Sequence, residues 1–214
     1  MTITWYGHSC FKIANQGGRL IIITDPFNKN IGLNPPRGSA DIVTVSHEHS
    51  DHNNAKTISG KPFIINSPGE YEVKGVGIIG CSSFHDLEQG KERGLNTIYL
   101  MKVDRIRLCH LGDLGQEQLT DEQLEAIGHV DILMVPVGGV ATIGARKAVK
   151  TIKQLEPYVV IPMHYKVPGL KLDLKNLEEF LKEMGLDKQK PVDKLTFKKK
   201  DLINKTMEVV VMKL

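Results

Sequence analysis

Short apolar segments separated by turn-forming residues dominate the first half of the chain. Some alternate between apolar and polar positions, as half-buried strands do, and others are apolar throughout, as in strands covered on both faces. The polar stretch Asn15–Gly18 between two of the first segments favours an antiparallel hairpin. The pattern predicts strands over residues 3–6, 10–14, 19–24, 41–45, 62–65, 70–73, 76–81, 96–103 and 105–109.

Helical patterns enter in the second half, where they alternate with apolar strands. Thr120 and Gln123 have the spacing of a capping box and predict a helix that ends near Gly128. Further helices are expected over residues 145–155 and 174–184, and strands over residues 131–135, 158–161 and 207–212. Strand-rich meanders interleaved with βα units predict an α/β protein in which two packed sheets have helices outside them, a four-layer αββα sandwich.

Length and charge add a few limits. The chain has 214 residues, so we expect a single domain over residues 1–214. The formal net charge of +3 gives no reason to expect a nucleic acid as partner, and no apolar run reaches the ~18 residues that would span a membrane. Residues 1–5 lack the features of a signal peptide, and the three scattered cysteines are expected to be buried and reduced, so we expect a cytoplasmic protein.

The candidate chemistry is concentrated in one segment, which directly follows the predicted strand over residues 41–45. It has the pattern HxHxDH, formed by His47, His49, Asp51 and His52. Such side chains are costly to bury together, because charged imidazoles repel one another and neutral ones need hydrogen-bond partners. A divalent metal removes that cost, and imidazole nitrogen with carboxylate oxygen suits Zn, Fe, Mn or Co. A solvated histidine-rich loop is the alternative.

This segment resembles the signature of the metallo-β-lactamase superfamily. The family pattern continues with a His, an Asp and a final His, and the chain has His85, Asp113 and His164 in that order. The resemblance covers essentially the whole chain and implies two divalent metal ions, zinc in the first place, with Mn or Fe as alternatives. It implies that one ion is bound by His47, His49 and His85 and the other by Asp51, His52 and His164, with Asp113 bridging both.

By the same resemblance, the protein is expected to hydrolyse an ester, lactone or phosphoester bond with a metal-bound hydroxide. Asp51 would orient or deprotonate the water, and Tyr165 would donate a hydrogen bond to the developing oxyanion unless it only packs. Arg93 would bind an anionic small-molecule substrate, with a solvated arginine at a hairpin tip as the alternative. The motif Gly7-His8-Ser9 and those around the last two ligands look most like the small cytoplasmic branch related to ascorbate-phosphate lactonase.

Three neighbouring residues have more than one interpretation. His110 is either a ligand or a residue that supports the site from behind. His8 lies in a predicted hairpin turn, where it either reaches the edge of the pocket or is a hydrogen-bonded turn residue. Asp25 resembles the family's strand-end aspartate and is expected to support the HxHxDH segment.

Three other functions stay open. A nucleic-acid-processing phosphodiesterase of the same superfamily normally carries an extra substrate-binding arm, and none is evident here. A di-iron redox protein of this fold has Glu at the second histidine of the motif, where this chain has His49. A non-catalytic metal-binding regulatory protein would keep the ligands without turnover, so only an activity measurement separates it from an enzyme.

Overall fold

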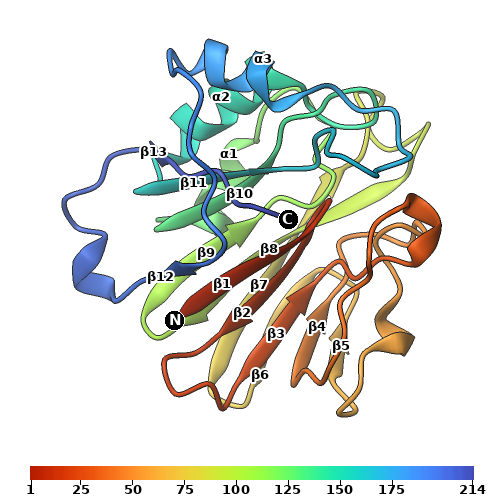
Figure 1. Ribbon diagram of the computed structural model, residues 1–214, viewed down its shortest axis with the longest axis vertical. Coiled ribbons are helices and arrows are strands. Elements are labelled where there is room, and N and C mark those ends of the chain that lie inside the picture. The colour runs from red at the N-terminus through yellow and green to blue at the C-terminus, as the bar shows by residue number, and fades with distance from the viewer.

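The predicted strands assemble into two β-sheets that face each other in the computed structural model, which describes residues 1–214 (Figure 1). The first sheet contains, in spatial order, β12 (Leu195–Thr196), β1 (Thr2–Gly7), β2 (Cys10–Ala14), β3 (Ile21–Thr24), β4 (Ile42–Thr44) and β5 (Phe63–Ile65). β1, β2 and β3 form the expected antiparallel meander, whereas β3, β4 and β5 run parallel.

The second sheet contains, in spatial order, β13 (Glu208–Val209), β11 (Val159–Met163), β10 (Ile132–Pro136), β9 (Ile106–His110), β8 (Leu95–Val103), β7 (Val76–Phe84) and β6 (Gly69–Val73). β6 to β9 are antiparallel, and β9, β10, β11 and β13 are parallel. One hydrophobic core of 59 buried residues includes side chains from both sheets, so each sheet is covered by the other.

The helices are few and short. α1 (Asp121–Ile127), α2 (Ala145–Leu155) and α3 (Leu177–Glu183) lie against the second sheet, on the side away from the first (Figure 1). The predicted capping box is present, because the Thr120 hydroxyl accepts from the backbone N–H of Gln123 while the Gln123 side chain accepts from that of Thr120. Beside the first sheet the chain forms only the 3₁₀ turns η1 (Lys29–Ile31) and η2 (Ala55–Thr57). The two facing sheets confirm the expected αββα class, with the outer layer over the first sheet reduced to these short turns. None of the helices has the length and apolarity needed to cross a membrane.

The structure departs from the expected elements near the C-terminus. α3 begins at Leu177 rather than at residue 174, because the backbone of Lys175 is bonded to Gly138 and Lys166 and holds this stretch extended. The last strand is limited to Glu208–Val209. β12 is missing from the expected elements; it is two residues long and exists only through pairing with β1. The 3₁₀ turn η3 (Lys199–Asp201) follows it.

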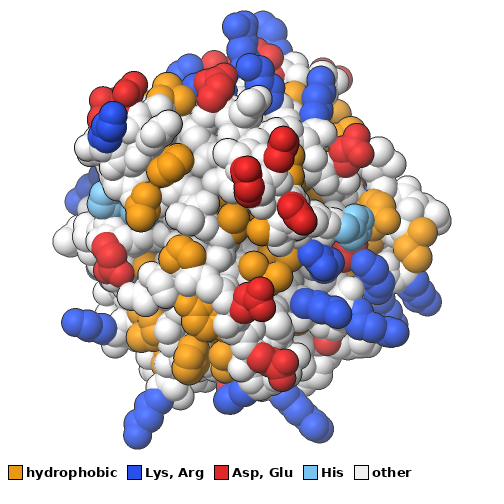
Figure 2. Space-filling view, turned by 180° about the vertical axis from the view of Figure 1, so that it is seen from behind, with side chains coloured by type: hydrophobic (Ala, Val, Ile, Leu, Met, Phe, Trp, Pro, Cys, Tyr) orange, Lys and Arg blue, Asp and Glu red, His pale blue; other side chains and the backbone are white.

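The face of the molecule in Figure 2 carries charges of both signs. Acidic and basic side chains are interspersed on it, with Lys and Arg gathered toward one edge. This mixture agrees with the small net charge of +3.

Several strands end at the same edge of the sandwich, and the candidate residues follow those ends. The HxHxDH segment follows β4, His85 follows β7, Asp113 follows β9 and His164 follows β11. β9, β10 and β11 are parallel neighbours, so their carboxyl ends necessarily lie side by side. The fold thereby places residues that are more than one hundred positions apart in the sequence around one point.

Candidate metal centre

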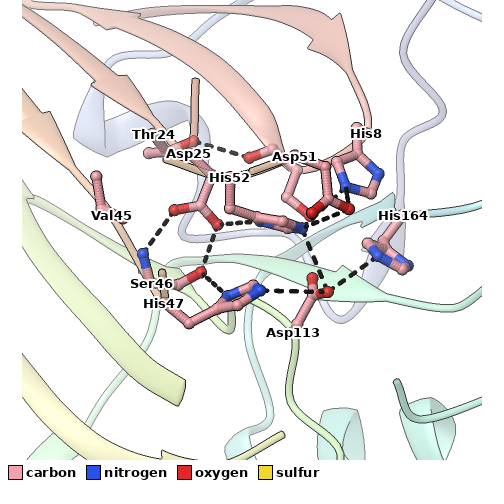
Figure 3. A network of polar contacts seen from close by, with 12 residues as sticks. His8, Thr24, Asp25, Val45, Ser46, His47, Asp51, His52, Asp113 and His164 are labelled. Carbon is pink, nitrogen blue, oxygen red and sulfur yellow. Dashed lines mark hydrogen bonds and ion pairs between the residues drawn. The ribbon is translucent and has the colours of Figure 1, made fainter. Parts of the chain in front are cut away.

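Asp113 lies at the middle of the cluster (Figure 3). Its side chain is almost fully buried, and its Oδ2 atom is 3.1 to 4.0 Å from the Nε2 atoms of four histidines, which are His164, His52, His85 and His47 in order of increasing distance. The carboxylate of Asp113 is thus surrounded by imidazoles that come from different parts of the chain. The pKa of Asp113 lies well below its ordinary value: burial opposes ionisation, but His164 and His52 outweigh it.

The first group of donors consists of His47, His49 and His85, whose ligand atoms all lie within 4.8 Å of one another. His47 and His85 are buried, whereas His49 is exposed. Burial lowers the pKa of His47 to about 3, so this imidazole is neutral at physiological pH and keeps a lone pair for a metal.

The second group surrounds His52. Its Nε2 atom is 3.3 Å from Asp113 Oδ2 and 3.8 Å from Asp51 Oδ2, and its ring stacks against His164 with centroids 5.9 Å apart. All seven residues that the family resemblance named are therefore brought together. Their assignment to individual metal ions remains a prediction, because the distances alone allow more than one partition of the histidines.

Asp25 supports both groups from behind (Figure 3). It is fully buried, and its carboxylate accepts hydrogen bonds from the Ser46 backbone N–H at 2.7 Å, the Ser46 hydroxyl at 2.6 Å and His52 Nδ1 at 2.9 Å. Because the Ser46 hydroxyl donates its proton to Asp25, its oxygen accepts a hydrogen bond from His47 Nδ1, 3.0 Å away. Asp25 thus holds a proton on Nδ1 of both histidines, directly for His52 and through Ser46 for His47, and turns both Nε2 atoms toward Asp113.

This arrangement fits a divalent cation. His47 Nε2 and Asp113 Oδ1 are buried and have no hydrogen-bond partner in the protein, which is costly unless another group satisfies them. Burial would lower the pKa of His52, but the carboxylates of Asp113 and Asp25 outweigh it and raise the pKa well above its ordinary value. Without metal, His52 therefore favours its protonated form between the two carboxylates, and a bound metal ion would occupy the place of that proton.

His110 has a different role. Its Nε2 donates to the Ser9 carbonyl at 2.8 Å, and its Nδ1 accepts from the Gly112 N–H at 3.2 Å. Both ring nitrogens are thus occupied by backbone groups. His110 fixes the loop that carries Asp113 to the turn between β1 and β2, which agrees with the supporting role considered from the sequence.

His8 lies much deeper than a turn residue is expected to lie. It is fully buried, with Nε2 2.9 Å from His52 Nε2 and 3.3 Å from Asp51 Oδ2. Sequence reasoning underestimated it because a histidine in a tight hairpin turn is normally solvated. The usable signal was topological: a turn between β1 and β2 lies at the edge where β4 also ends.

Three residues of the cluster have backbone conformations that L-amino acids rarely adopt. The φ angles are 54° at His8, 39° at Asp25 and 54° at His164. Each such residue costs about 1–3 kcal/mol, and strain of this kind concentrates at functional sites. Packing around the cluster therefore holds these side chains in place against local backbone preference.

Tyr165 is the predicted site residue that the cluster does not include. Its ring packs against Trp5 with centroids 5.3 Å apart and lines a separate cavity with Val211 and Leu214. Burial raises its pKa, so the phenol stays protonated. The packing role considered from the sequence describes this placement better than oxyanion stabilisation does.

A cavity of about 340 Å³ opens beside His85. Arg93, Lys147 and Lys175 line it, and it includes the N-terminal end of α2 at Gly144. The loop that carries Arg93 is organised by Asp86, whose carboxylate accepts four backbone N–H groups from residues 88–93 at 2.7–3.0 Å. Those bonds lower the pKa of Asp86 despite its desolvation.

Two facing sheets, with imidazole and carboxylate side chains that could hold a metal gathered at the strand ends, define the class: a metalloprotein of the metallo-β-lactamase fold. Comparison with known proteins agrees. Residues 2–164 match the family profile described as Beta-lactamase superfamily domain. A protein from Thermotoga maritima that is described as a member of the metallo-β-lactamase superfamily superposes with a TM-score of 0.79 at 39% identity, covering 99% of this chain and 97% of that one.

Curated relatives extend over most of the chain as well. A UPF0173 metal-dependent hydrolase of Archaeoglobus fulgidus is 30% identical over 222 residues, covering 87% of this chain and 93% of its own. Another UPF0173 metal-dependent hydrolase, from Thermococcus onnurineus, is 29% identical over 211 residues, covering 86% of this chain and 92% of its own. The chain therefore belongs to the metallo-β-lactamase superfamily, in the group whose members are named UPF0173 metal-dependent hydrolases.

Proposed function

We propose that this protein hydrolyses an ester, lactone or phosphoester bond of a small anionic substrate at a pair of divalent metal ions, with zinc as the first choice and Mn or Fe as alternatives. The observation that carries the proposal is the cavity beside His85, where one candidate metal ligand lies with three cationic side chains, Arg93, Lys147 and Lys175, and two acidic ones, Asp86 and Glu92. Bound metal ions would supply an activated water and a Lewis acid for the scissile group. The protein supplies the ligands, the orientation and the charge that attracts the substrate.

Arg93 is the side chain best placed to hold an anionic group. It lines both the cavity beside His85 and a second cavity of about 340 Å³ that includes His47 and His49. Its guanidinium forms no salt bridge, whereas Lys147 pairs with Glu117 and Lys175 with Glu179. An unpaired guanidinium between two openings of one ligand cluster suits bidentate binding of a carboxylate or phosphate.

Asp51 is proposed to orient the attacking water. Its side chain keeps 24% of its surface exposed, unlike the buried Asp113. Burial would raise the pKa of Asp51, but hydrogen bonding to His8 and the charge of His52 outweigh it and keep the carboxylate ionised. An ionised carboxylate that is partly exposed can orient a water through a strong, charge-assisted hydrogen bond.

The test is a substrate screen with the metal-loaded protein. Lactones, carboxylate-bearing esters, phosphodiesters and thioesters would each be paired with an uncharged analogue of the same reacting bond. We expect turnover of at least one anionic compound and a kcat/KM for it that falls in Arg93→Gln, with little change for its neutral partner. Turnover of neutral substrates only would contradict the substrate class, and no turnover by a fully metallated protein would favour the non-catalytic alternative.

A nucleic-acid-processing phosphodiesterase is the second hydrolytic candidate. The phosphodiester arm of the screen, extended to a short single-stranded RNA, separates it from a small-molecule hydrolase. The mixed charge of the surface in Figure 2 and the small volume of the cavity favour the small molecule.

A further inference from the structure

His8 is held in the centre by its backbone. Its carbonyl accepts two hydrogen bonds, from Trp5 Nε1 at 3.0 Å and from the His164 N–H at 3.2 Å. Its φ of 54° is unfavourable for a histidine, so this backbone conformation has a free-energy cost that the surrounding contacts must offset. The first bond comes from the preceding strand β1, and the second comes from a predicted metal ligand.

The side chain of His8 converges with that group (Figure 3). Its ring centroid is 4.5 Å from that of His52 and 4.4 Å from that of His164, and the ligand atoms of these three buried histidines lie within 4.8 Å of one another. His8 Nε2 faces two atoms that could bind a metal: His52 Nε2, whose ring is bonded through Nδ1 to Asp25, and Asp51 Oδ2.

The separations match those between adjacent ligands of one ion. Metal–nitrogen bonds of about 2.0–2.1 Å place neighbouring donors about 2.9 Å apart at a right angle and about 3.4 Å apart at the tetrahedral angle. The distances from His8 Nε2 are 2.9 Å to His52 and 3.3 Å to Asp51, and Asp113 Oδ2 lies 3.3 Å from His52 and 3.1 Å from His164.

A hydrogen bond from His8 does not explain this position once a cation is bound. The lone pairs of His52 and Asp51 then point to the cation, and a proton on His8 Nε2 would face the same positive charge. Moving that proton to Nδ1 turns the Nε2 lone pair toward the cation instead.

We propose that His8 is a direct ligand of the second metal ion. The second position then has five protein donors, His8, Asp51, His52, Asp113 and His164, against four at the first, His47, His49, His85 and Asp113. Five donors exceed the tetrahedral set of zinc, so the second position takes a five- or six-coordinate ion and differs in metal preference from the first. The inference rests on the metal-binding part of the proposed function and is independent of hydrolysis.

The experiment titrates metal-free protein with Co²⁺, monitored by calorimetry and by visible absorption. His8→Asn is the main variant, because Asn tolerates a positive φ better than most residues, and His8→Gly relaxes that φ fully. His49→Asn removes a donor of the first position, and His129→Asn is the matched control, a half-exposed histidine bonded to Asp131 away from the cluster. Circular dichroism and melting of each metal-free variant report folding.

We expect two Co²⁺ equivalents for the wild type and for His129→Asn. His8→Asn and His8→Gly should lose more than about 100-fold in affinity for one equivalent, beyond the usual effect of a residue that only supports a ligand. In the same two variants, the weak absorption bands of the five- or six-coordinate second ion should change. The bands of the first ion, which are those that His49→Asn alters, should stay as in the wild type. An unchanged spectrum of the second ion in a folded His8 variant would overturn the proposal, as would a wild-type protein that binds only one ion.

A crystal structure of the metal-loaded wild type tests the same point without a substitution. We expect His8 Nε2 about 2.0–2.2 Å from the second ion. A separation beyond about 3 Å would overturn the ligand assignment. Neither readout depends on activity, so failure to find a substrate leaves this result intact.

Discussion

Replacing Asp25 by Asn tests whether the centre depends on the tautomers that this carboxylate selects. In the wild type, Oδ1 accepts from the Ser46 N–H and Oδ2 accepts from the Ser46 hydroxyl and His52 Nδ1. If the Asn oxygen stays on the Ser46 N–H, the amide NH₂ faces His52 Nδ1 and forces the His52 proton onto Nε2, the atom that faces the metal. If the amide flips, its NH₂ confronts the Ser46 N–H, and two buried donors oppose each other.

Both arrangements weaken metal binding without removing a ligand. Outer residues that orient metal ligands typically contribute 10–100-fold to affinity, which corresponds to about 1.4–2.7 kcal/mol. We expect a loss of this size for the ion bound by His52, and a smaller loss for the ion bound by His47, which Asp25 reaches only through Ser46. The metal-free protein also loses charge-assisted hydrogen bonds, each of about 1.5–3 kcal/mol, and should melt at a lower temperature.

The assay is competition for Zn²⁺ with a chelator of known affinity at constant pH, with melting curves recorded alongside. Asp131→Asn is a matched control: Asp131 is equally buried and accepts from the Arg107 N–H, His129 and Lys199, but it lies outside the cluster. It should lose stability and keep wild-type metal affinity. A folded Asp25→Asn protein that binds both ions as tightly as the wild type would refute the tautomer argument.

Four further outcomes are expected. Calorimetric titration with Zn²⁺ should show two ions per chain, since the donors exceed what one tetrahedral ion takes, and saturation at a single ion would contradict the dinuclear centre. His85→Ala should lower metal affinity far more than His110→Ala, whose nitrogens bond to backbone groups, and equal losses in chelator competition would mean that the third histidine is misassigned. Asp51→Asn should lower kcat by about 100-fold or more with a smaller change in KM, and a fully metallated variant with wild-type kcat would exclude its role on the water. Burial would raise the pKa of Asp131, but hydrogen bonding to Lys199 outweighs burial and lowers the pKa, so the ionised carboxylate stabilises the fold above the unfolded pKa of about 4 and this contribution is lost as the pH falls through the lower folded pKa. Urea titrations at pH 7 should therefore show Asp131→Asn to be less stable than the wild type by about 1.5–3 kcal/mol, and a difference that persists at low pH would contradict the argument.

Local patterns account for most of the fold that the sequence predicts. The apolar strands and the capping box at Thr120 depend on neighbouring residues, and the structure reproduces them. β12 and the late start of α3 depend on distant partners, β1 in one case and Gly138 in the other, so no local pattern reports them. The candidate site shows the same contrast. The motif of residues 47–52 is visible in six consecutive residues, whereas the placement of Tyr165 depends on packing against the distant Trp5.

His8 and Asp25 show why a site can exceed its motif. Each has a positive φ, and each reaches the cluster from a different strand end, so their neighbours in sequence carry no ligand pattern. His8 is fixed by bonds from Trp5 and from His164, residues 3 and 156 positions away along the chain. The strain is tolerated because β1, β3 and β11 end at one edge and the surrounding core holds all three turns. The HxHxDH segment begins at this same edge, where β4 ends. His8 therefore joins the cluster through the topology of the two sheets, because its turn lies at the edge that carries the motif.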